Sequence, residues 1–105
     1  MRITISHNQS KERVMKSVDR SFDDLFRGIG IVPLQFVAEE RNWQGSVLHF
    51  SISAKMGFLS TPIRGIVEVT DRDLTIDVDL GFLERIIAPS KAREALTSRI
   101  RGLLR

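Results

Sequence analysis

Apolar and polar residues alternate strictly from Leu74 to Leu80. This period of two is that of a β-strand with one buried face and one solvated face. Gly81 ends the alternation, and two bulky apolar residues, Phe82 and Leu83, follow it. The pattern predicts a sheet that is covered on one side only.

The alternating stretch 63–70 is predicted to pair with this strand as a hairpin, with Asp71 and Arg72 as its turn. A two-residue turn sets apolar or small residues opposite one another on one face: Val69 and Leu74, Val67 and Ile76, Gly65 and Val78, Ile63 and Leu80. On the other face Arg64 lies opposite Asp79, and such a cross-strand pair stabilises by up to ~1 kcal/mol. Both faces therefore predict the same register.

Two further elements precede this hairpin at the start of the chain. Residues 2–6 alternate and predict a short strand, and Asn8 or Ser10 can cap a helix that runs to about Arg27. Gly28, with a second glycine two residues later, ends that helix. Its apolar residues recur at spacings of three and four and form one stripe: Val14, Met15, Val18, Phe22, Leu25 and Phe26.

Residues 34–43 and 47–53 predict a second hairpin around the turn at 44–46. Its register stays open, because the charged run 39–41 interrupts the apolar pattern of the first arm. Residues 54–61 are expected to form a connecting loop, although they include large apolar side chains that need burial or a binding role.

Residues 84–105 have a helical pattern, which Pro89 can divide in two. Arg99 falls within the apolar stripe of this segment, where it can reach the rim or pair with a carboxylate of the sheet. The order strand, helix, four strands, helix predicts a single α+β domain: a two-layer sandwich of an antiparallel sheet with two amphipathic helices on one face.

The repeated tripeptide Gly-Phe-Leu, at 57–59 and 81–83, is brought to one end of the 63–80 hairpin by the predicted register. The residues expected to gather there are Met56, Phe58, Leu59, Phe82, Leu83, Ile86 and Ile87. They can form a secondary core under the last helix, or an apolar contact patch for a partner, a ligand or a hydrophobic surface. Lys91, Arg101 and Arg105 are the candidate basic face of that helix.

The chain of 105 residues has a net charge of +3 and no cysteine, which excludes disulfides and thiolate chemistry. Its start does not resemble a signal peptide, and no apolar run reaches the ~20 residues of a membrane span, so a cytoplasmic location is expected. Nucleic-acid binding is disfavoured, because the basic residues lack interleaved aromatic ones.

No catalytic, cofactor or metal constellation is predicted. His7 and His49 have no positioned partner: His49 is expected to face solvent and His7 to belong to a helix cap. The aspartates at 71, 73, 77 and 79 are not a calcium loop: alternation sends Asp77 and Asp79 to one face of a strand, and the glycine and terminal glutamate of such a loop are missing. Trp43 is expected to close one end of the core.

The segments 43–50, 64–69 and 78–83, together with the opening 3–5 and the terminal helix, resemble the polyhydroxyalkanoic acid system protein family. The resemblance implies a small, non-enzymatic bacterial protein of the polyhydroxyalkanoate (PHA) synthesis and storage system, in some cases at the granule surface. That family carries no established catalytic residues. The predicted partners are therefore the PHA granule surface or a PHA-system protein. A carrier of an acyl or other hydrophobic ligand, and a homodimeric module, remain alternatives.

Overall fold

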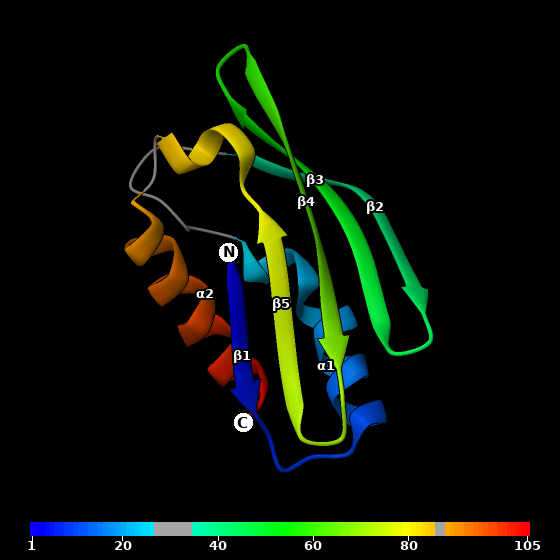
Figure 1. The fold of residues 1–105 in the computed structure, drawn as a ribbon. Coiled ribbons are helices and arrows are strands. Elements are labelled where there is room, and N and C mark those ends of the chain that lie inside the picture. The colour runs from blue at the N-terminus through cyan, green and yellow to red at the C-terminus, as the bar shows by residue number, and fades with distance from the viewer. Residues whose placement is uncertain (27–34, 86–87) are drawn as a thin grey trace.

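A computed structural model describes residues 1–26, 35–85 and 88–105. The elements are β1 (Arg2–Ser6), α1 (Lys11–Leu25), β2 (Gln35–Gln44), β3 (Val47–Met56), β4 (Leu59–Val69), β5 (Asp73–Asp79), the 3-10 helix η1 (Gly81–Arg85) and α2 (Pro89–Leu103). The strands form one antiparallel sheet in the order β1-β5-β4-β3-β2, with both helices on one side of it (Figure 1). The predicted α+β class and element order are confirmed.

The core lies between the helices and the inner face of the sheet. In β5 the apolar residues Leu74, Ile76 and Val78 are buried, while the alternate positions are half-buried or exposed. The helices contribute their apolar stripes to the same cluster: Val14, Val18, Phe22 and Leu25 from α1, and Ala92, Leu96 and Ile100 from α2. Burial of these apolar side chains is the main term that stabilises the fold.

The predicted register of the β4–β5 hairpin is confirmed from Val69 opposite Leu74 through to Arg64 opposite Asp79. The β2–β3 register, which the sequence leaves open, sets Trp43 opposite Leu48 around a two-residue turn at Gly45. A β-bulge between Ala38 and Glu40 shifts this pairing partway along β2. The bulge explains why the apolar pattern of the first arm is irregular.

The expected loop at 54–61 is wrong. β3 and β4 continue their pairing through this segment, with Ala54 opposite Thr61 and Met56 opposite Leu59. The turn is only two residues, Gly57 and Phe58, and Gly57 has a φ of +61°, which a tight hairpin turn favours and glycine adopts without strain.

Among the described residues the last segment is helical in two parts, with the division at Pro89 that the sequence indicates. Glu84 and Arg85 belong to η1, and α2 begins at Pro89, where the missing proline N–H costs no helical hydrogen bond. α1 ends at Leu25 with Phe26 as its C-cap, close to the predicted end at about Arg27, whereas the predicted glycine stop lies outside the described residues. None of the described helices is long and apolar enough to cross a membrane.

β2 is an edge strand of the sheet, and two of its side chains contact α1. The Arg41 guanidinium lies 5.3 Å from the centre of the Phe22 ring, and its Nε is 3.7 Å from a carboxylate oxygen of Asp19. The Trp43 indole N–H donates to the same carboxylate at 3.2 Å. Trp43 is half-buried against the core, which fits the predicted role of closing it. The charged residue Arg41 thus covers the edge of the core rather than disrupting it.

Two other polar side chains join distant elements. His7 is buried between the Gln9 N–H, which donates to its Nδ1 at 3.2 Å, and the Thr70 carbonyl, 2.9 Å from its Nε2. It is part of the β1–α1 connection, while Ser10 caps α1. Arg99 donates to the Asp24 carbonyl near the end of α1. Of the two alternatives for Arg99, this contact at the half-exposed boundary between the helices fits the rim rather than a carboxylate of the sheet.

Candidate functional site

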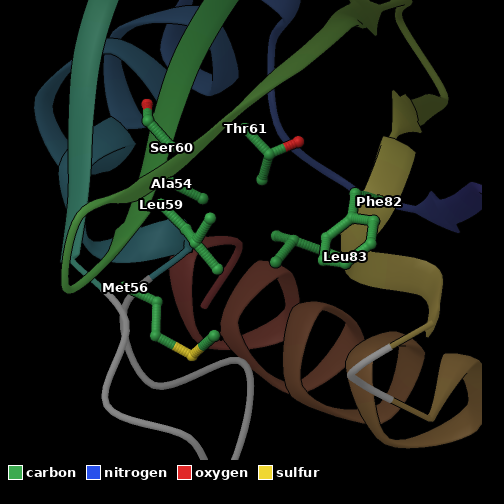
Figure 2. Close-up of a pocket in the computed structure, with 7 residues that line it drawn as sticks. All are labelled: Ala54, Met56, Leu59, Ser60, Thr61, Phe82 and Leu83. Carbon is green, nitrogen blue, oxygen red and sulfur yellow. The ribbon is translucent and has the colours of Figure 1, made fainter.

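The repeated Gly-Phe-Leu segments meet at one end of the molecule. One forms the β3–β4 turn and the start of β4, and the other opens η1 directly after β5. We call the described apolar residues of these segments and the adjacent Met56 the apolar end: Met56, Phe58, Leu59, Phe82 and Leu83. Figure 2 shows Leu59 and Leu83 pointing toward each other, with the Phe82 ring beside Leu83.

In η1 the side chain of Phe82 points outward and that of Leu83 points into the core. Gly81 has a φ of +55°, and its N–H donates to the Asp79 carboxylate at 2.9 Å. The Leu83 N–H then donates to the Leu80 carbonyl at 3.1 Å and begins the 3-10 turn. As a result Leu83 is buried in the core, whereas Phe82 is about half exposed, at 51%.

Most of the exposed large apolar side chains among the described residues lie at this end. Phe58 is 98% exposed at the tip of the hairpin, and Leu59 is 50% exposed beside it. Together with Phe82 they make three of the four such residues, the fourth being Val37 in β2. Exposed apolar residues that gather in one place typically mark a contact surface.

A pocket of about 260 Å³ lies within the apolar end (Figure 2). Its wall is the outer part of the β3–β4 hairpin and the start of η1: Ala54, Met56, Leu59, Ser60, Thr61, Phe82 and Leu83. The Ser60 hydroxyl lies 2.7 Å from that of Ser53, with which it forms a hydrogen bond. None of the described lining residues carries an acidic, basic or imidazole group, so this pocket is suited to binding an apolar group.

The structure brings together four of the seven residues predicted for the contact patch. Met56, Leu59, Phe82 and Leu83 share the pocket, while Phe58 projects from the turn outside its lining. Ile86 and Ile87 lie outside the described residues. Three lining residues were not predicted: Ala54, Ser60 and Thr61. Of these, Ala54 continues the alternation of inward residues along β3 and is buried. Extending that alternation past residue 53 would have found it.

The candidate basic residues Lys91, Arg101 and Arg105 are all exposed along α2 and its end. Lys91 lies in the first turn, whereas Arg101 and Arg105 follow more than two helical turns later, which places them over ~15 Å further along the axis. They therefore do not form one compact patch.

Other chemistry-bearing residues remain apart. His49 is exposed on β3, as predicted. Within residues 1–26, 35–85 and 88–105, no group of three or more His, Cys, Asp or Glu side chains could hold a metal ion. Asp73 accepts a hydrogen bond from the Ser6 hydroxyl at 3.0 Å and so belongs to the β1–β5 pairing.

Comparison with known proteins gives no relative: no protein family, no curated protein and no solved structure matches this chain.

Proposed function

We propose that this chain is a non-enzymatic accessory protein of the PHA synthesis and storage system that attaches to the hydrophobic granule surface through its apolar end. One observation carries the proposal: Phe58, Leu59 and Phe82 are each at least half exposed and lie at the same end of the molecule. The biological setting comes from the sequence resemblance described above. A PHA-system protein exposed on the granule is the alternative partner for the same surface.

Phe58→Asp with Phe82→Asp replaces both exposed aromatic residues. The affinity for purified PHA granules, measured by co-sedimentation, is expected to fall by roughly 100-fold or more. Removing a large apolar side chain from an interface costs about 1.5–3 kcal/mol, so two such losses suffice for that effect. Asn42→Asp with Gln44→Asp is the matched control, because it adds the same two charges at exposed positions of the opposite end of β2, where these residues pair with His49 and Val47.

The double variant must keep its fold, which circular dichroism checks. A folded double variant that binds granules as tightly as the original chain contradicts the proposal. Particles of bare polymer distinguish the two partners: a chain that binds native granules but not bare polymer recognises a granule protein. Light scattering gives the molar mass of the original chain and of the double variant. A dimer that the double variant loses would indicate that the apolar end is a homodimer interface.

The pocket of about 260 Å³ supports a second candidate, the binding of an acyl chain. Its volume lies just below the usual range of small-molecule pockets, which suits a short aliphatic group. Saturating octanoate or 3-hydroxyoctanoate is expected to raise the free energy of unfolding by about 2–3 kcal/mol at a hundred times the Kd. Leu59→Trp, which fills the pocket, removes that shift. An unchanged unfolding midpoint with the original chain excludes this function.

A further inference from the structure

Three exposed cations lie in the elements that form or follow the apolar end. They are Lys55 in β3, Arg85 in η1 and Lys91, six residues after Arg85, in the first turn of α2. One exposed acid, Glu84, lies in the same turn of η1 as Arg85. Arg64 and Asp79 are nearby but directly opposite each other across β4 and β5, so their charges offset. Arg93 and Glu94, both exposed just after Lys91, offset each other, so an excess of positive charge remains in these elements.

Lys55 and Arg85 lie beside the two exposed aromatic residues. Lys55 comes three residues before Phe58 and pairs with Ser60, so it projects near the hairpin tip from the face opposite to Met56 and Leu59. Arg85 follows Phe82 by three residues in η1. Side chains three apart in a 3-10 helix eclipse each other, so Arg85 projects from the same side of η1 as Phe82.

Lys91 adds a third cation from the last helix. It lies in the first turn of α2, and Figure 1 shows that α2 begins below η1 and runs away from it. Long basic side chains can extend along apolar surface and still place their charge at a polar boundary. Arg101 and Arg105, further along α2, do not have this position.

We propose that the apolar end docks on an anionic lipid surface, with Phe58 and Phe82 among the acyl chains and Lys55, Arg85 and Lys91 on the phosphate headgroups. This inference rests on the proposed attachment to the granule surface, and it adds that the surface which the chain contacts is an anionic lipid layer. Aromatic rings with adjacent cations are typical of proteins that lie in a lipid interface. Each basic residue close to an anionic surface strengthens binding about fivefold.

The test is flotation of the full chain with vesicles of phosphatidylcholine, with or without phosphatidylglycerol. The original chain is expected to bind the vesicles with phosphatidylglycerol more tightly, and this binding weakens with added salt. Lys55→Gln, Arg85→Gln and Lys91→Gln together are expected to weaken it on the order of 100-fold. The matched control changes three exposed arginines elsewhere, Arg20, Arg101 and Arg105, to glutamine and so removes the same net charge.

Equal loss in the two triple variants overturns the inference, since overall charge would then explain binding. Equal binding of the original chain to both vesicle types also overturns it, while attachment to granules through Phe58 and Phe82 would still stand. Failure to bind any vesicle likewise overturns it, and co-sedimentation with bare polymer then decides the proposed function separately. All six changes are at exposed positions, so thermal unfolding is expected to stay within a few degrees of the original.

Discussion

Phe22→Ala is expected to lower the free energy of unfolding by about 3–5 kcal/mol, the usual loss for a buried phenylalanine. Phe22 lies where α1 meets the sheet, with its ring centre 5.2 Å from that of Phe50 and 5.9 Å from that of Phe26. The Arg41 guanidinium covers it from β2. Truncation therefore leaves a cavity and also removes the edge-to-face ring contacts and the cation–π contact.

Thermal unfolding followed by circular dichroism measures this effect, with an expected fall in Tm of about 15–30 °C. Phe58→Ala is the matched control, since Phe58 is 98% exposed. Its effect is expected to stay within about 0.5 kcal/mol. A loss below about 1 kcal/mol for Phe22→Ala would show that this ring is not central to the core.

Gly65→Ala is expected to destabilise the chain by about 3 kcal/mol, because the added methyl group has no room. A Cβ at this position would lie 2.6 Å from the Asp77 carbonyl oxygen and 2.8 Å from Cζ of Phe50. It would also lie 3.1 Å from the Val78 Cα. A change of the Phe50 χ1 angle can relieve one of these contacts, since Cζ lies on the axis of ring rotation and does not move when the ring alone turns. The other two are with the backbone of β5, so the sheet itself must shift.

Gly102→Ala provides the control for this substitution. A Cβ at Gly102, near the end of α2, meets nothing within 4 Å. The same change is therefore expected to stabilise by up to about 0.5–1 kcal/mol through helix propensity and reduced freedom of the unfolded chain. Urea unfolding of the two variants should give midpoints on opposite sides of the original. If Gly65→Ala unfolds at the same urea concentration as the original chain, the close approach of Gly65 to the backbone of β5 is contradicted.

The β4–β5 hairpin shows what the sequence can establish. Its apolar face and its Arg64–Asp79 pair both require one register, and that register is observed. The β2–β3 hairpin could not be predicted in the same way. Its pairing depends on a bulge beside Glu39 and on the contacts of Arg41 with Asp19 and Phe22, which join residues about 20 positions apart.

The candidate site was predictable in part. Pairing Ile63 with Leu80 was enough to bring the two Gly-Phe-Leu segments to one end, although not to separate the buried Leu83 from the exposed Phe82. The composition of 54–61 predicts a loop, because a glycine is equally common in loops and in tight turns. In the structure Gly57 supplies the positive φ of a hairpin turn, and β3 and β4 pair right up to it. The distinction depends on cross-strand partners, which local composition does not reveal.

The bulge in β2 has a consequence for self-association. β2 is an edge strand of ten residues, and a long regular edge can pair with the edge of another molecule. Here the bulge breaks the regular spacing of free backbone groups, and Glu39 and Glu40 place exposed carboxylates at the same point. Two copies that approach edge to edge in antiparallel pairing would bring these like charges together. The charged run 39–41, which interrupts the apolar pattern of this strand in the sequence, thus disfavours edge-to-edge pairing of β2 between two copies.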